Sequence, residues 1–347
     1  MDFLNEYFKY ENGLTITGLT RELNVFYVLN LFNKESKNVL VLANTLYEAN
    51  LFYDNLRTYT DDVCLFPMDD FLTSVAVAIS PDLKIKRLET LERIRTGNKC
   101  IVVTNLMGYL RFLPDMKNTS NLEFNLDKKT SIKRDDILEL LDKYGYIRES
   151  VVTTTGEYAV RGYIIDLFII DEEHPIRIEF FGDDVDSIRY FDENTQLSIK
   201  EIDSIKIKPY TEVVSDSNSS LCDYMNDPWV LMVNRDQIEV SYAKLVDDIN
   251  EYNESTESDK KHMYAWEDIS YSHVMYLNSV NDNDYGKVLS FKSQEIENFN
   301  SNFELLGKYC SKQLLGNKTV ILCLSKENQF LASGIQHRDL CPSSPVG

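Results

Sequence analysis

The sequence predicts an α/β protein in which a three-layer domain on a parallel sheet is followed by a smaller, mainly antiparallel domain. Short continuous apolar runs alternate with helical patterns over the first ~115 residues, as expected for a buried parallel sheet. Between Tyr146 and Pro209 the pattern changes to short strands, and the apolar–polar alternation of Pro175–Phe181 and Ser204–Lys208 is typical of antiparallel strands with one buried face. Hydrophobic residues make up 43% of the 347 residues, enough apolar mass for two or three domains.

Three apolar runs predict the buried strands of the first domain: Asn38–Ala43, Val63–Phe66 and Cys100–Thr104. Apolar residues recur at roughly helical spacing over Thr45–Tyr59, which predicts a helix after the first strand. A further helix is predicted from Ser80-Pro81-Asp82 to Thr96-Gly97. Its start combines a Ser N-cap, a Pro at the first helical position and an acid in the first turn.

The second domain is predicted to contain several short strands. Leu122–Gly145 is charged, helical in its second half, and is interpreted as a connector. Pro175–Phe181 alternates, so Ile176, Ile178 and Phe180 share one strand face, and Arg177, Glu179 and Phe181 share the other. Gly182-Asp183-Asp184 has the composition of a turn, which predicts that Val185–Phe191 is the return strand of a hairpin. Ser204–Lys208 predicts a further strand.

Helices are expected to dominate after Tyr210, as far as a buried strand at Lys318–Leu324. The polar stretch Asn250–Lys261 is interpreted as a loop. Gly334–Gly347 has no periodicity, and we expect a disordered or non-native tail there.

The net charge of -20 is unevenly distributed, since Thr211–Cys310 holds 19 Asp/Glu and 7 Lys/Arg. Such a surface repels phosphate backbones, so direct DNA binding by this half is disfavoured and a solvated surface is favoured over a dedicated acidic interface. The acidic N-terminus is not a signal peptide, and no apolar stretch approaches the ~20 residues of a membrane span. We therefore expect a cytoplasmic protein with no membrane partner.

Catalytic and metal-binding patterns are missing from the sequence. The six cysteines have no zinc spacing, and Cys64, Cys100 and Cys323 are interpreted as reduced core thiols. His174 is expected in a solvated loop, while His262 and His273 are placed in a Tyr-rich helical region. No nucleophile, general base or metal ligand is predicted.

One segment resembles a phosphate-binding loop only weakly. Ile16–Glu22 holds Thr17, Gly18 and Thr20, but it has a single Gly, no Lys, and Glu22 where an anion would lie. An ordinary turn into a helix near Val25–Phe32 is favoured, and no cofactor is predicted.

A specific resemblance lies in the second domain. Gly156–Phe168 (GEYAVRGYIIDLF) and His174–Arg189 (HPIRIEFFGDDVDSIR) together resemble the motif pair of the UvrA-binding domain shared by UvrB and the bacterial transcription-repair coupling factors (Mfd). Asp184 replaces a Glu of that pattern and keeps its charge. UvrB has an intact phosphate loop and a long aromatic hairpin, whereas Phe66–Asp82 is too short for that hairpin. With Arg87–Leu91 this run resembles the coupling factors instead.

The resemblance implies a degenerate P-loop, helicase-like domain split into 1A (residues 1–125) and 1B (210–335), with the UvrA-binding domain 2 (126–209) inserted between them and a tail at 336–347. It also implies that the chain is the front module of a longer protein. RNA polymerase and double-stranded DNA would be bound by modules absent here. A C-terminal domain would mask domain 2 in the resting protein.

The resemblance further implies that Arg161, Arg177 and Phe181 dock UvrA, with Glu179 and Arg189 as weaker candidates. An Arg beside an exposed aromatic residue is also the usual composition of an interface hot spot. Two alternatives remain open: Arg161 could pair internally with Glu157 or Asp166, and Phe181 could lie in a second small core.

We therefore expect a non-catalytic module that recruits UvrA. The rival hypotheses are a divergent UvrB-type ATPase that still binds nucleotide, a purely structural scaffold whose domain 2 surface is covered, and direct DNA binding.

Overall fold

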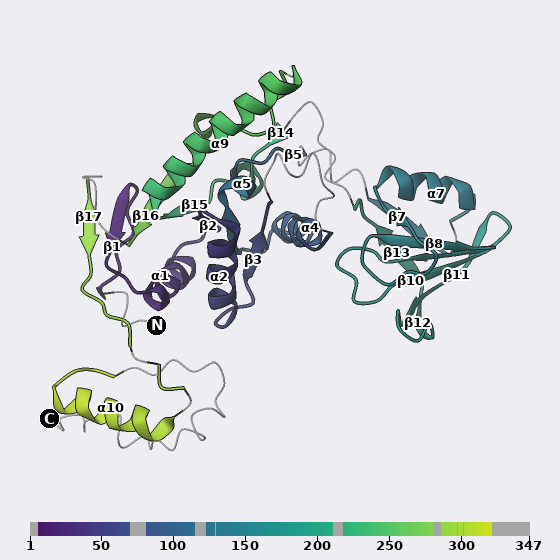
Figure 1. Ribbon diagram of the computed structural model, residues 1–347. Helices are drawn as coiled ribbons and strands as arrows, with labels where there is room; N and C mark the ends of the chain where they lie inside the picture. The colour runs from purple at the N-terminus through teal and green to yellow at the C-terminus, as the bar shows by residue number, and fades with distance from the viewer. Residues whose placement is uncertain are drawn as a thin grey trace.

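The computed structural model describes residues 6–69, 81–114, 123–128, 130–210, 218–257, 259–279, 286–296, 298–300 and 302–320, and it contains two sheet-based units (Figure 1). The larger unit has a parallel sheet covered by helices on both faces, and the smaller has a mainly antiparallel sheet. The predicted α/β fold class is therefore confirmed.

The larger sheet has seven strands in the order β17-β1-β16-β15-β2-β4-β3. Every neighbouring pair is parallel, so each connection has to cross over a face of the sheet. The strands are β1 (Leu14–Thr17), β2 (Val39–Ala43), β3 (Val63–Phe66), β4 (Ile101–Asn105), β15 (Trp229–Val233), β16 (His273–Asn278) and β17 (Val288–Ser290).

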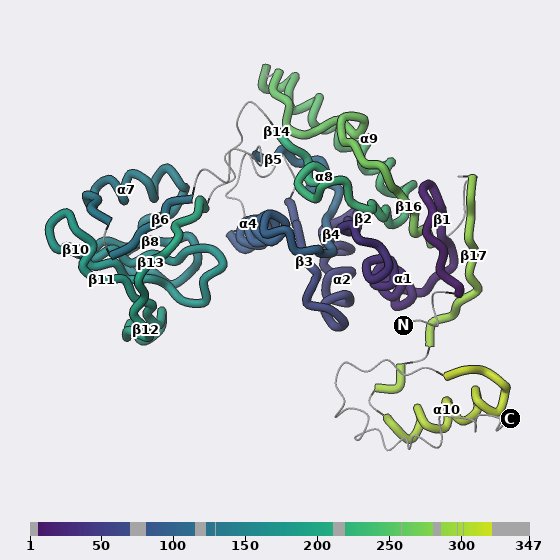
Figure 2. The backbone as a smooth tube through the Cα atoms, turned by 180° about the vertical axis from the view of Figure 1, so that it is seen from behind, coloured from purple at the N-terminus to yellow at the C-terminus, as the bar shows by residue number. Residues whose placement is uncertain are grey.

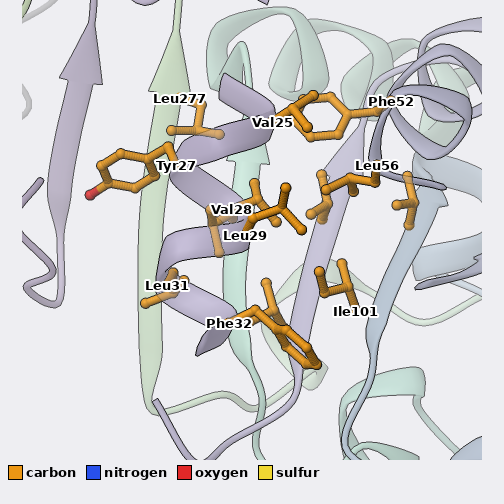
Figure 3. Close-up of a cluster of buried hydrophobic side chains, with 14 of the residues drawn as sticks. Val25, Tyr27, Val28, Leu29, Leu31, Phe32, Phe52, Leu56, Ile101 and Leu277 are labelled. Carbon is orange, nitrogen blue, oxygen red and sulfur yellow. The ribbon is translucent and has the colours of Figure 1, made fainter. Parts of the chain in front are cut away.

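Two apolar cores lie on opposite faces of this sheet. Along β2, Val39 and Val41 enter one core while Leu40 and Leu42 enter the other, as the alternation of side chains in a strand requires. The first core is covered by α1 (Arg21–Lys34) and α2 (Leu46–Arg57), whose packing Figure 3 shows. The second core is covered by α4 (Pro81–Arg95), α5 (Leu106–Tyr109), α8 (Leu221–Tyr224) and α9 (Arg235–Thr256).

Segments that precede and follow the smaller unit in the sequence build this one sheet, which corrects the expectation that helices dominate after Tyr210. β15 and β16 lie in the middle of the sheet, and β17 forms one edge. The β15 run, WVLMV, has the same apolar character as the predicted strands, but polar and acidic surroundings hid it. His273 opens β16 instead of lying in a helix.

Three further expectations of local structure are corrected or lie outside the described residues. α9 continues to Thr256, so the first part of Asn250–Lys261 is helix; its polar residues are the solvent side of an amphipathic helix. Within Leu122–Gly145, β6 (Phe124–Asp127) pairs with β13 (Ser204–Ile207), so this segment is part of the smaller unit. Most of the predicted strand at Lys318–Leu324 and all of 334–347 fall outside the described residues.

The smaller unit has a six-stranded sheet in the order β12-β11-β10-β9-β8-β7. Its neighbours are antiparallel except for the short β7–β8 pair. One face packs on α7 (Arg134–Lys143) and on β6 and β13 around a single apolar core. The strands are β7 (Ile147–Arg148), β8 (Glu157–Arg161), β9 (Ile164–Leu167), β10 (Ile176–Phe181), β11 (Asp184–Phe191) and β12 (Ser198–Ile202).

Helix α4 belongs to both units, and Figure 2 shows it on the side of the larger unit that faces the smaller one. Its Leu91 and Ile94 enter the larger unit's second core, whereas Ile85 and Leu88 pack against the core of the smaller unit. The Lys208 ammonium lies 2.8 Å from a Glu92 carboxylate oxygen across the same joint. The joint is thus both apolar and ionic.

The remaining described elements are short or peripheral: β5 (Leu113–Pro114), β14 (Asn218–Ser219), a 3-10 turn (Trp266–Asp268) and α10 (Phe303–Leu315). The four cysteines of the described part, which include Cys64 and Cys100, are buried free thiols; Cys323 lies outside it. Among the described helices, none is long and apolar enough to cross a bilayer.

The central place of β15 gives a first prediction. Leu231→Ala removes a fully buried side chain from the middle of the sheet, and we expect the free energy of unfolding to fall by about 2–5 kcal/mol. Val240→Ala on α9, where the side chain is 72% exposed, should change it by no more than about 0.5 kcal/mol. Urea denaturation measures both. Equal effects would mean that β15 is not a core strand.

Candidate protein-binding site

The predicted site residues lie on one face of the smaller sheet, the face opposite α7, which we call the outer face. Strand register brings them into neighbouring rows. Arg177 on β10 is opposite Asp166 on β9 and Arg189 on β11. Glu179, two residues along β10, shares this face, as the alternation of β10 predicts.

The Asp166 carboxylate is the buried charge around which this face is organised. Its side chain is 1% exposed, and it accepts hydrogen bonds from Nε and Nη2 of Arg177 at 2.6 and 2.8 Å. This bidentate geometry is the strong form of a charge-assisted pair. The guanidinium also lies over the Phe191 ring, 4.5 Å from its centroid, so it is fixed on two sides.

Arg161 is held much more loosely. Its Nη2 lies 3.9 Å from Asp166, whose two oxygens already bind Arg177, and the Arg161 side chain is 46% exposed. Glu157, the other internal partner considered, instead accepts the backbone N–H groups of Thr153 and Thr154. Internal pairing therefore satisfies only a small part of the Arg161 guanidinium.

A second ion pair crosses from β10 to β11. Both terminal nitrogens of Arg189 donate to Glu179, at 2.7 and 2.5 Å, and the Ser187 hydroxyl donates to the same carboxylate at 2.8 Å. The Arg189 hydrogen bonds lower the pKa of Glu179 to about 2. This pair therefore keeps its charges through the physiological pH range.

Phe181 ends β10 at the tip of the β10–β11 hairpin and is 81% exposed. The strand register shifts between Glu179 and Phe180, and Gly182 closes the turn with φ +66. A second small core does exist on the sheet, formed by Val152, Ala159, Phe168 and Phe191. Phe181 is not part of it, so the alternative that buried Phe181 in a small core is wrong.

Two supporting residues were not singled out from the sequence. Phe191 provides the ring on which Arg177 stacks, and Gln196 Oε1 accepts a 3.3 Å hydrogen bond from Arg177 Nη2. Gln196 has φ +61 in the turn before β12, a local conformation with no clear pattern in the sequence. The sequence indicates Asp166 only as a partner for Arg161, yet its main partner is Arg177.

The weak phosphate-loop candidate forms a turn between β1 and α1. Thr20 caps α1 by accepting a 3.4 Å hydrogen bond from the Leu23 N–H, and Glu22 lies in the first turn. The backbone at Gly18 and Thr20 is bonded to Ser293. Elsewhere in the described part of the chain, no group of three or more His, Cys, Asp or Glu side chains is placed to hold a metal ion.

A sheet that presents fixed charges and two exposed aromatic side chains, Phe181 and Tyr163, has the composition typical of a protein-interaction surface. Comparison with known families agrees with this class. Residues 124–212 match the UvrB interaction domain family, and this range contains the whole outer face.

The chain is also similar to transcription-repair-coupling factors. That of Bacillus subtilis is 31% identical over 201 residues, which cover 57% of this chain and 17% of the relative. That of Staphylococcus epidermidis is 33% identical over 213 residues, which cover 61% and 18%. The resemblance predicted from the sequence is therefore confirmed, and the aligned part spans less than a fifth of the length of these relatives.

The buried charge of Asp166 gives a second prediction. Arg177→Ala leaves this carboxylate without its main partner, and we expect a loss of about 3–5 kcal/mol in the free energy of unfolding. Asp166→Asn in the same background removes the stranded charge and should restore part of that loss. Chemical denaturation of the single and double variants measures the difference. No recovery in the double variant would show that packing on Phe191, and not charge, explains the loss.

The Glu179 pKa gives a third prediction. Since the folded state lowers it from 4.5 to about 2, the carboxylate contributes stability that is fully present above about pH 4.5 and is lost as pH falls towards 2. The stability difference between the wild type and Glu179→Gln should shrink over this window. Denaturation at a series of pH values checks this, and a difference that is constant from pH 6 to about pH 2 would contradict it.

Proposed function

We propose that this chain recruits UvrA through the outer face of its smaller unit and contributes no catalysis of its own. The observation that carries the proposal is the exposed Phe181 ring within the matched family domain, on the same sheet as the under-bonded Arg161 guanidinium. Exposed aromatic and Arg side chains on one surface are the residue types that dominate binding energy at protein interfaces.

The ion pairs on the outer face order its charged side chains before a partner binds. Arg177 uses Nε and Nη2 internally, and no hydrogen bond is found for its Nη1 within the described residues. Asp166 thus holds the Arg177 guanidinium in place and leaves its Nη1 group to donate to a partner. Because Arg177, Arg189 and Glu179 are already ordered, little side-chain entropy is lost when a partner docks. Arg161 and Phe181 are proposed as the main contacts, with Arg177 offering its remaining N–H groups.

The proposal extends to the whole protein. In a full-length transcription-repair coupling factor, this module would deliver UvrA to nucleotide excision repair at a stalled RNA polymerase. The modules that bind the polymerase and use ATP to move on double-stranded DNA would lie elsewhere in the chain. The division into domain 1A (1–125), domain 2 (126–209) and domain 1B (210–335) is part of this proposal, as are a masking C-terminal domain and a cytoplasmic location.

Three observations favour this proposal over its rivals. A purely structural scaffold would bury the outer face, yet Phe181 is exposed. A divergent ATPase would need free backbone amides in the β1–α1 turn, whereas Thr20 N–H already donates to Ser293. The acidic surface of residues 211–310 also remains unfavourable for direct DNA binding.

The fourth prediction tests the contact directly. In surface plasmon resonance with immobilised UvrA, Phe181→Ala and Arg161→Ala should each weaken binding by about 1–4 kcal/mol, or roughly five- to several-hundredfold in Kd. Arg177→Lys keeps a charge beside Asp166 and removes the planar donor edge, so it is preferable to Arg177→Ala as a binding variant.

Tyr47→Ala is the matched control, since Tyr47 is an exposed aromatic residue on α2 of the other unit. It should bind UvrA like the wild type. Failure of the wild-type chain to bind UvrA would remove the proposed function. Binding that survives Phe181→Ala and Arg161→Ala would keep the partner and reject the outer face.

A further inference from the structure

The β1–α1 turn of the larger unit is covered by a distant segment, residues 288–293, which we call the strap. Its first part is β17, which pairs with β1 in parallel through Thr15, Ile16 and Thr17. The Thr17 hydroxyl donates to the hydroxyl of Ser290, the last residue of β17, at 2.9 Å, and beyond β17 the Phe291 N–H donates to the Thr17 carbonyl at 2.8 Å. The strap therefore follows β1 to its carboxyl end and continues over the turn.

Ser293 bonds to the turn at the position where helix N-termini bind anions. Its hydroxyl oxygen accepts the Thr20 N–H at 2.9 Å, and the same hydroxyl donates to the Gly18 carbonyl at 2.5 Å. Free N–H groups at the start of a helix after a strand are the usual donors to phosphate. Here a neutral hydroxyl satisfies the N–H of Thr20, the N-cap residue that precedes α1, and the Thr20 side chain satisfies the Leu23 N–H in the first turn. The Glu22 carboxylate lies in the first turn of α1, where its negative charge interacts favourably with the helix dipole, so no bound anion is needed for this interaction.

Gly18 is what allows the strap to lie this close. Its φ is +74, and a Cβ built there would be 2.0 Å from the carbonyl oxygen of Phe291. Phe291 itself packs against the first core and contacts the Phe8 ring, with 5.8 Å between ring centroids. The missing side chain of Gly18 thus leaves room for the strap backbone, and the Phe291 side chain attaches the strap to the first core.

We propose that the strap is an internal ligand of the β1–α1 turn, which occupies the anion-binding position and makes closure of the turn independent of nucleotide. It also attaches the segment that leads to α10, which Figure 1 shows below the parallel sheet, to the N-terminal strand. This inference concerns the larger unit and does not rest on the proposed contact with UvrA.

The fifth prediction compares two glycine variants in the full chain. Gly18→Ala forces the Phe291 carbonyl away, whereas Gly97→Ala introduces an Ala at nearly the same backbone angle, φ +77, with no atom within 4 Å. Hydrogen–deuterium exchange of residues 286–296 should become at least about tenfold faster in Gly18→Ala and stay unchanged in Gly97→Ala. Equal exchange in the two variants would overturn the proposal.

Two further arms keep the test informative if Gly18→Ala does not fold. Ser293→Ala should speed exchange of the same residues, and Ser293→Thr, which keeps the hydroxyl, should leave it near the wild-type rate. Equal rates in the two variants would overturn the role of the hydroxyl.

Titration of the wild type with magnesium–ATP and with pyrophosphate should give no saturable binding. Saturable binding that protects the amides of residues 17–24 would show an open site and reject the strap as its ligand.

Discussion

The outer face of the smaller sheet depends on one buried carboxylate. Asp166 sits inside a β-strand with almost no access to water, where an unpaired negative charge would be very costly. Arg177 supplies the compensating charge and is placed by the β9–β10 register directly opposite. The requirement for neutrality therefore fixes the orientation of the Arg177 guanidinium, its stacking on Phe191 and its contact with Gln196. Only Arg161, which reaches the same carboxylate from farther away, keeps substantial freedom.

The larger sheet is governed by a different constraint. Because parallel strands are joined by crossovers and not by tight turns, a wholly parallel sheet can combine strands from distant parts of the chain. Here β1 and β2 come from the first 43 residues, while β15, β16 and β17 come from positions beyond 228. These early and late strands pair with one another in the sheet, and the strap adds hydrogen bonds between residues that are 273 positions apart in the sequence. The smaller unit lies between these strands in the sequence, and Ile85 and Leu88 of α4 pack against its core.

The features that local chemistry determines could be predicted from the sequence. Continuous apolar runs identified β2, β3 and β4, the Pro81 start identified α4, and alternation placed Arg177, Glu179 and Phe181 on one face. Strands β15 and β16 were missed because polar segments surround them and their role comes from pairing with distant strands. The same applies to the site. Motifs located its residues, but only the three-dimensional register shows that Asp166 binds Arg177 in preference to Arg161.

The two units differ in how far the hydrogen-bonding groups of their candidate sites are satisfied within the chain, and this difference bears on function. In the β1–α1 turn, the strap hydroxyl and backbone satisfy groups at Thr17, Gly18 and Thr20, which in many α/β proteins face a ligand. On the outer face, hydrogen bonding is complete enough to hold the side chains but leaves Arg161 and Phe181 facing solvent. An exposed phenylalanine gains nothing for the isolated fold, because its apolar surface stays in water. What distinguishes Phe181 from other exposed apolar side chains, such as Tyr47, is its place on an ordered, charge-paired sheet within the range that matches the UvrB interaction domain, and the proposed partner-binding function rests on this combination.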